Sequence, residues 1–343
     1  MFGLEAGEGK TFEVSYDKLI LAPGYVSFSS RYSYHANVTS CVTNTFRTPG
    51  AEENAFFVRN VADAKKVQSR IKQLLELASL PGTAEQDQRD LLHIVIVGGG
   101  PTGIELSAEL SDLFNEDFAK LYPHLAGKFS IVIYDAAHYI LADFEESLRE
   151  HAIGSFSKRG VQVITDARIK NVASDSITTE AEGRTSCGMV LWTAGNKQCP
   201  LVDALDVAKT DKLPRIMTDE FLRVLKPDKT PMDNVFALGD AADIKKYFLP
   251  TTAEVAIQKA RYVANMLNKD AYDQPFAYMQ KALVAYIGGH DGVVKGNPNW
   301  SGQRAWRAWR SKNLLWTKSY RRKFMIVAYW VLGWLGGTEI ARA

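Results

Sequence analysis

A short apolar run that leads into a glycine-rich turn constrains this 343-residue chain more than any other feature. The run His93 to Val97 is mostly β-branched, as expected of a central parallel strand that is covered on both faces. The turn that follows has the spacing G-x-G-x-x-G and consists of Gly98, Gly99, Gly100, Pro101, Thr102 and Gly103. Its first glycine permits a tight turn, its second lets the backbone approach a pyrophosphate, and its third packs helix against strand. The pattern predicts a dinucleotide site; the simpler alternative is a glycine turn without a ligand.

A second predicted strand, residues 129–134, ends at Asp135. A carboxylate at that point accepts hydrogen bonds from an adenosine ribose and repels a 2′-phosphate, which favours NADH over NADPH. Asp135 lies further along the chain than the usual distance of about 20 residues. We therefore expect the first helix, or the loop after it around residues 115–128, to be extended.

The rest of the chain alternates strands with helices, which predicts an α/β fold with a parallel sheet. Helices are expected at residues 61–80, 147–159 and 250–267, and a polar linker at residues 83–90. Strands are expected at residues 11–14, 18–22, 161–164, 189–195 and 234–238. The last of these leads into Gly239 and Asp240, at the carboxyl end of a strand, where open α/β sheets bind ligands.

Composition places the chain among folded globular proteins, since 46% of its residues are hydrophobic and 23% are charged. Its length suits more than one domain. The three cysteines, Cys41, Cys187 and Cys199, have neither C-x-x-C nor metal-ligand spacing, so we expect free thiols and no metal site. We found no signal peptide or basic transit sequence at the start of the chain.

Several of these segments together resemble the type II, non-proton-pumping NADH:quinone oxidoreductases, which are flavoproteins with two dinucleotide-binding domains. The resemblance covers nearly the whole chain and depends on the order and spacing of its motifs. They are the glycine turn and the segments Tyr16 to Gly24, Pro49 to Phe57, Leu191 to Asn196, Gly239-Asp240, Pro250 to Gln258 and Ala285 to Gly289.

The resemblance implies that NADH passes a hydride to FAD and that the reduced flavin passes two electrons to a membrane quinone. It implies NADH contacts at the six turn residues and at Glu105, Asp135, Ala194, Gly195 and Asn196. It implies FAD contacts at Ala22, Pro23, Gly24, Gly239, Asp240, Thr252 and Ala253, with Asp240 on the ribityl chain. The helix beginning near Ala253 would direct its positive end at the flavin. The alternative for Asp240 is a helix N-cap.

The quinone segment departs from the family pattern, which usually has Ala-Gln followed by a second Gln. Here Ala253 is followed by Glu254, and the second position is Gln258. We expect both side chains at the quinone, with Glu254 favouring its neutral form beside an apolar tunnel. The alternative is that Glu254 is a solvated helix residue.

The last 43 residues carry nine Lys or Arg and one Glu, a local charge of +8 on a chain whose formal charge is +2. Residues 303–335 combine this charge with five of the seven tryptophans. The apolar run at residues 324–337 is shorter than the roughly 20 residues that span a bilayer, so we expect the segment to lie on a membrane surface. The alternative is a core helix with a basic face. Nothing else in the chain resembles a nucleic-acid module, so no nucleic-acid partner is expected.

Flavoproteins of this class have two glycine fingerprints, and this sequence has one. We therefore expect two Rossmann-like domains, the first incomplete, plus a C-terminal membrane-associating helical segment, and suspect that the sequence is truncated. The expected divisions are 1–58, a remnant of the FAD-binding domain; 59–190, the NADH-binding domain; 191–270, the second part of the FAD-binding domain; and 271–343, the membrane-anchoring region.

The resemblance further implies a peripheral protein of the mitochondrial inner membrane, with a homodimer as one option. Two other functions stay open. One is an inactive fragment that binds NADH and membrane. The other is a related ferroptosis-suppressor-like or apoptosis-inducing-factor-like quinone reductase. A disulfide reductase of the thioredoxin-reductase branch is disfavoured because the NAD domain has no C-x-x-C, and one of the glutathione-reductase branch is disfavoured by the tail and by Ala253 to Gln258.

Overall fold

The computed structural model describes residues 4–6, 10–24, 42–197, 200–211, 213–269, 274–317 and 319–336. These residues form two compact units, and each unit is built from two separate stretches of chain. Unit 1 contains residues 1–44 and 195–281, and unit 2 contains residues 45–194 and 282–343. Cys41 and Cys199 lie outside the described residues.

Unit 2 is built around a five-stranded sheet in which every pairing is parallel. In spatial order its strands are β5 (Phe56–Phe57), β12 (Met189–Trp192), β6 (His93–Val97), β7 (Ser130–Tyr134) and β8 (Val161–Ile164). Ile94 and Ile96 pack into the cluster on one face, while Val95 and Val97 pack into the cluster on the other. The predicted burial of this strand on both faces is therefore confirmed.

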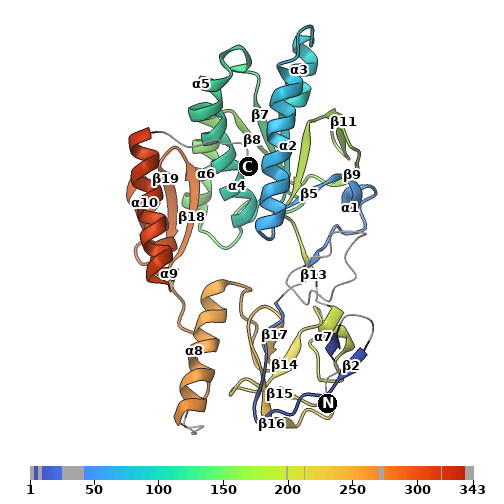
Figure 1. Cartoon of the computed structure of the whole chain (residues 1–343), viewed down its shortest axis with the longest axis vertical. Coiled ribbons are helices and arrows are strands. Elements are labelled where there is room, and N and C mark those ends of the chain that lie inside the picture. The colour runs from blue at the N-terminus through green and yellow to red at the C-terminus, as the bar shows by residue number, and fades with distance from the viewer. Residues whose placement is uncertain are drawn as a thin grey trace. The chain divides into compact units, whose positions relative to one another are not determined.

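Helices cover one face of this sheet, as Figure 1 shows. They are α2 (Val61–Ala78), α4 (Pro101–Asp112) and α6 (Glu146–Lys158), with the short α3 (Glu85–Leu91), whereas the short α1 (Ala51–Asn54) packs on the other face beside β9. The other face carries an antiparallel sheet of β9 (Ile169–Val172), β10 (Ser176–Thr179) and β11 (Gly183–Ser186). The predicted polar linker at residues 83–90 is wrong: α3 occupies it, held by pairs four residues apart such as Arg89 with Glu85.

The first helix after the glycine turn is extended, as its spacing from Asp135 predicted. α4 continues without a break into a π-helical turn η1 (Leu113–Phe118), then α5 (Ala119–Leu121) and η2 (Pro123–Leu125). Phe114 and Phe118 of this extension are buried, and Phe114 stacks on Phe129 just before β7.

The C-terminal stretch of unit 2 adds an antiparallel sheet and two helices. The sheet contains β18 (Leu283–Gly288), β19 (Asp291–Lys295) and β20 (Trp300–Ser301), and the helices are α9 (Gln303–Trp316) and α10 (Tyr320–Gly336). Helix α9 packs against the β18–β19 hairpin (Figure 1). Among the described residues, no helix combines the length and the apolar character needed to cross a bilayer.

Unit 1 contains a mixed five-stranded sheet in the order β17 (Ala242–Ile244), β14 (Ile216–Thr218), β15 (Arg223–Leu225), β16 (Pro231–Ala237) and β3 (Leu19–Leu21). Its helices are α7 (Pro200–Ala204) and α8 (Ala253–Lys269). Two small pairs complete it: β1 (Leu4–Ala6) with β2 (Lys10–Phe12), and β4 (Val42–Thr43) with β13 (Asn196–Lys197).

Candidate functional site

The glycine turn of unit 2 joins β6 to α4, and each fingerprint glycine has a different environment. Gly98 has φ +115°, a backbone conformation that favours glycine. A Cβ on Gly103 would lie 1.9 Å from the carbonyl oxygen of Gly98, so only glycine lets α4 approach β6. A Cβ on Gly100 would meet nothing within 4 Å. The turn is thus closed at its first and third glycines and open at the second, where a pyrophosphate is expected.

Asp135 follows β7 and reaches the same turn. One of its carboxylate oxygens accepts a hydrogen bond from the Gly99 amide, and the other accepts one from the Ala137 amide at 2.7 Å. Each oxygen has a further lone pair for a ribose hydroxyl. The structure therefore brings Asp135 to the open side of the turn, although its role toward a ribose stays a prediction.

The end of β12 closes the turn from the neighbouring strand. The Thr193 hydroxyl lies 3.0 Å from the Val97 carbonyl oxygen and 3.2 Å from that of Gly98, and donates to this pair. Thr193 is a residue that the sequence analysis did not single out. Ala194 ends this stretch of unit 2, whereas Gly195 and Asn196 belong to unit 1.

Glu105 of α4 is turned toward the C-terminal stretch of unit 2. Its carboxylate accepts hydrogen bonds from the Trp309 indole at 2.9 Å and from the Tyr286 amide at 3.3 Å. Burial raises the pKa of Glu105, and these two hydrogen bonds oppose that rise. The assignment of Glu105 to the NADH contacts stays a prediction, and its observed partners belong to the hairpin and α9.

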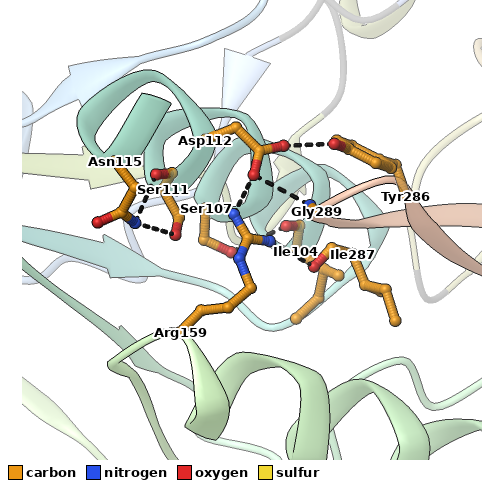
Figure 2. A network of polar contacts seen from close by, with 9 residues as sticks. All are labelled: Ile104, Ser107, Ser111, Asp112, Asn115, Arg159, Tyr286, Ile287 and Gly289. Atoms are coloured by element: carbon orange, nitrogen blue, oxygen red, sulfur yellow. Dashed lines mark hydrogen bonds and ion pairs between the residues drawn. The ribbon is translucent and has the colours of Figure 1, made fainter. Parts of the chain in front are cut away.

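A polar network centred on Asp112 joins the end of α4 to the same hairpin (Figure 2). The Asp112 carboxylate accepts hydrogen bonds from the Arg159 guanidinium, the Tyr286 hydroxyl and the Gly289 amide. Arg159 also donates to the carbonyl oxygen of Ile287 at 3.0 Å. The Arg159 and Asp112 side chains are only 17% and 16% exposed, so this ion pair is largely removed from water.

In unit 1, the candidate flavin residues gather at one end of the sheet. β16 pairs in parallel with β3, with Ala237 opposite Leu21. The turn of Ala22, Pro23 and Gly24 therefore lies beside the turn that carries Gly239 and Asp240. The Leu238 amide donates to the Leu21 carbonyl at 3.0 Å and ties the two strand ends together.

Asp240 is half-buried, and within the described part of the chain its carboxylate receives no hydrogen bond. Burial raises its pKa, while the charges of Arg215 and Lys259 oppose the rise. Gly239 before it has φ +77° and open space where a Cβ would be. A carboxylate without a donor beside an open glycine suits the hydroxyls of a polyol chain, so these residues fit the ribityl part of FAD.

A cluster of buried charges beneath this turn was missed by the sequence analysis. Lys259 of α8 is 1% exposed and donates to the Ala242 carbonyl at 3.0 Å. Asp243 is also 1% exposed and pairs with Arg215 at 3.0 Å. Burial lowers the pKa of Lys259. The three positions are far apart in sequence, and only the folded sheet reveals the cluster.

The two candidate quinone residues lie on one face of α8 and contact each other. The Gln258 amide donates to Glu254 at 2.8 Å, and also exchanges two hydrogen bonds with the backbone of Met279. Lys281 forms an ion pair with Glu254 at 2.6 Å. Burial alone would raise the pKa of Glu254, but the hydrogen bonds from Lys281 and Gln258 hold it below its ordinary value. The expectation of a neutral Glu254 is wrong because Lys281 stabilises the carboxylate.

The tail expected on a membrane divides into two helices with different surroundings. On α9, Trp309 stacks on Tyr286 with ring centroids 4.8 Å apart, and both Trp306 and Trp309 pack against the core of unit 2. The expectation that all of residues 303–335 face a membrane is therefore wrong for these two. On α10, large apolar side chains are exposed, including Phe324 at 72% and Leu332 at 66%.

Arg310 connects the two helices. Its guanidinium lies 4.3 Å from the ring centroid of Trp330 on α10 and 5.3 Å from that of Trp306 on α9. Such cation–π contacts stabilise the pairing of the helices. They leave the exposed apolar residues of α10 outside the helix pair.

Comparison with known proteins agrees with this geometry. A protein-family model described as pyridine nucleotide-disulphide oxidoreductase matches residues 2–260. A probable NADH dehydrogenase of Dictyostelium discoideum is 33% identical over 339 residues, which cover 97% of this chain and 70% of the relative. A mitochondrial internal alternative NAD(P)H-ubiquinone oxidoreductase A1 of Solanum tuberosum is 30% identical over 366 residues, covering 99% and 69%.

Among solved structures, NDH2 from Plasmodium falciparum in complex with NADH superimposes with a TM-score of 0.84 at 21% identity. The match covers 98% of this chain and 81% of that protein. At this level of identity the likeness shows the fold, which is the α/β fold with Rossmann-like units that the sequence predicted. From the family match and these relatives, the chain belongs to the pyridine nucleotide-disulphide oxidoreductases and, within them, to the type II NADH:quinone oxidoreductases.

Proposed function

We propose that this chain oxidises NADH and reduces a quinone without pumping protons. The observation that carries the proposal is the glycine turn of unit 2, which is open at Gly100 and has the Asp135 carboxylate beside it. The relatives named above are NADH dehydrogenases and NAD(P)H-ubiquinone oxidoreductases, which supports the same reaction.

Unit 2 would bind NADH through backbone groups and one carboxylate. The amides at the start of α4 would face the pyrophosphate, because a helix N-terminus presents unpaired N–H groups and a positive dipole end to an anion. Asp135 would accept hydrogen bonds from the adenosine ribose and disfavour a 2′-phosphate. The preference of this site is therefore for NADH.

Unit 1 would hold the ribityl and ring end of FAD. Asp240 would accept hydrogen bonds from ribityl hydroxyls, and the first turn of α8, from Ala253, would present backbone N–H groups to the flavin. Bound there, FAD would supply the two-electron chemistry that links NADH oxidation to quinone reduction. Glu254 and Gln258 would face the quinone, with Glu254 ionised by its contact with Lys281.

Thiol chemistry is disfavoured at Cys187, the one cysteine among the described residues. Burial raises the pKa of the Cys187 thiol to about 12, so almost no thiolate exists near neutral pH. The family to which the chain belongs includes disulfide reductases, and this cysteine is unsuited to that branch of its chemistry.

NADH binding and activity test the proposal together. Gly100→Ala should place a methyl group in the open turn and weaken NADH binding by at least tenfold, since backbone could no longer approach the pyrophosphate. Gly154→Ala on α6 is the matched control, because it also adds a Cβ to open space and should leave binding unchanged. Protein fluorescence quenching gives the Kd, and NADH consumption with a short-chain quinone gives the rate. Equal NADH affinity in the Gly100→Ala and unaltered proteins would overturn the proposal.

We further propose that unit 2 attaches through α10 to the surface of the mitochondrial inner membrane; the plant relative named above is mitochondrial by its name. The exposed apolar side chains of α10 follow directly on Arg321, Arg322 and Lys323. Cations beside exposed apolar residues suit anionic headgroups and the acyl boundary below them. Nothing in this arrangement requires the helix to cross the bilayer.

Flotation with vesicles containing cardiolipin tests the membrane proposal. Phe324→Glu combined with Leu332→Glu should abolish co-flotation, whereas Val61→Glu, an equally exposed change on α2, should leave it intact. If the double variant floats like the unaltered chain, α10 is not the attachment site. A homodimer formed through α10 would instead appear in sedimentation velocity as a doubled mass that the double variant loses.

A further inference from the structure

An apolar cavity of about 310 Å³ lies within unit 2, between α2, the α4–η1 helix and α10. Its deepest residues are Val67, Ile71 and Phe118, each at most 6% exposed. The volume is at the lower end of the range for small-molecule sites, which are mainly apolar with a few polar groups at defined places. None of the residues that line the cavity belongs to the glycine turn or to the candidate flavin residues.

The walls and rim of the cavity differ in polarity. Leu106 and Leu113 form an apolar wall, whereas Gln68 and Lys72 on α2 place an amide and a cation at the side. This arrangement suits a ligand with a long apolar body and an anionic or polar head. A nucleotide, which would need several polar partners along its length, is a poor fit.

Helix α10 closes one side of the cavity through Tyr329, which is 59% exposed. On the same helix Phe324, Val331 and Leu335 are exposed apolar residues. When α10 lies on a membrane, the opening beside Tyr329 therefore lies at the level of the lipid headgroups, within reach of the chains below.

We propose that this cavity binds one hydrocarbon chain of a membrane phospholipid, with the lipid phosphate near Lys72. The inference rests on the membrane attachment proposed above. At roughly 30 Å³ for each water-sized group, the cavity holds on the order of ten heavy atoms, which is part of one acyl chain and far less than a whole lipid. The bound chain would fix α10 against α2 and hold unit 2 at the membrane.

Photo-crosslinking tests the proposal with the full chain and two probes. The first probe is a phosphatidylcholine with a diazirine in one acyl chain, in vesicles that also contain cardiolipin. The second is a diazirine fatty acid used in solution as a monomer, without vesicles. Mass spectrometry then locates the labelled peptides. We expect both probes to label α2 between Ala64 and Lys72 and the η1 turn.

A pair of alanines on α2 supplies the variant and its control. Ala64 lines the cavity and Ala62 does not, and both are exposed on the same helix. Ala64→Trp should fill the mouth and lower labelling of α2 and η1 at least fivefold, while Ala62→Trp should leave it unchanged. Since both changes are at exposed positions, neither should prevent folding.

Several results would overturn the proposal. One is labelling confined to α10, which would mean that the chain never enters the cavity. Another is equal α2 labelling in the two tryptophan variants. A third concerns competition for the phospholipid probe. If a tenfold excess of a long-tailed quinone abolishes the labelling and the same excess of unlabelled phospholipid does not, the occupant is the quinone tail. If vesicles fail to bind but the soluble fatty acid still labels α2, the membrane attachment fails and the cavity assignment stands.

Discussion

The Asp112–Arg159 ion pair provides the sharpest test of how unit 2 is held together. Asp112→Asn removes the charge that balances Arg159, whose side chain is 17% exposed. Breaking a buried pair from one side costs about 3–5 kcal/mol. Because Arg159 is partly solvated and keeps its bond to Ile287, we expect the lower end, about 3 kcal/mol in the free energy of unfolding.

Removing the arginine instead of the aspartate should lower the free energy of unfolding by less. Arg159→Met leaves the Asp112 carboxylate with two donors, the Tyr286 hydroxyl and the Gly289 amide. We therefore expect a loss of about 2 kcal/mol in the free energy of unfolding, within the range of about 1.5–3 kcal/mol for a hydrogen bond to a charged group. In the double variant neither charge is left unbalanced, so its loss should be at least 1 kcal/mol smaller than the sum of the two single losses.

Tryptophan fluorescence during urea unfolding measures these losses in unit 2 alone. All seven tryptophans of the chain lie in the stretches that form unit 2, and Trp309 stacks on Tyr286 within the network. Arg184→Met is the control, because its ion pair with Asp175 is in the same unit and mostly exposed, so its loss should leave the free energy of unfolding nearly unchanged. If the losses of unfolding free energy in the two single variants add up to the loss in the double variant within about 0.3 kcal/mol, the predicted coupling between Asp112 and Arg159 is refuted.

Three further outcomes are expected. Gly103→Ala should lower the melting temperature of unit 2 as well as weaken NADH binding, because its methyl group would lie 1.9 Å from the Gly98 carbonyl oxygen. Calorimetry measures the melting temperature, and an unchanged value contradicts this prediction. The lowered pKa of Glu254 means that its contribution to the stability of unit 1 is present at neutral pH and lost as the pH falls through the folded pKa. Lys281→Met should therefore destabilise unit 1 at pH 7, and its difference from the unaltered protein in circular dichroism should shrink as the pH falls; a difference that does not change with pH contradicts this. Gly288→Ala should loosen the contact between the hairpin and Arg159 at the end of α6, since its Cβ would lie 1.3 Å from a guanidinium nitrogen of Arg159. Faster hydrogen exchange in β18 would reveal this change.

Local pattern was enough to predict the strand–turn–helix that carries the proposed NADH site. The β-branched run His93 to Val97 and the glycine spacing act over a dozen residues, and β6 and α4 form where they were expected. Helix α2 was expected at residues 61–80 and observed at Val61–Ala78, because its apolar periodicity is strong. Helix α3 has no apolar face, so periodicity could not reveal it.

Contacts between distant segments were beyond the reach of these patterns. The indole of Trp309 donates a hydrogen bond to Glu105, about 200 residues earlier in the chain. Trp309 was expected on a membrane, and this contact holds it against the core of unit 2. A basic helix rich in tryptophan has the same composition whether it lies on lipid or on protein. The ionisation of Glu254 was mispredicted for the same reason, because it depends on a contact with Lys281 from the segment after α8.

The interleaved course of the chain has a consequence for its synthesis. Strand β3 is synthesised about 200 residues before its parallel partner β16, with Val235 opposite Leu19. At about 5–20 residues per second, β3 waits about 10–40 s for that partner. Unit 2 waits as well, since α4 is covered by β18, which is made after unit 1 is complete. Unit 1 therefore completes its sheet only after β16 has been made, and unit 2 completes its core only after β18 has been made. Until then their exposed strand edges and apolar helix faces are natural targets for chaperones.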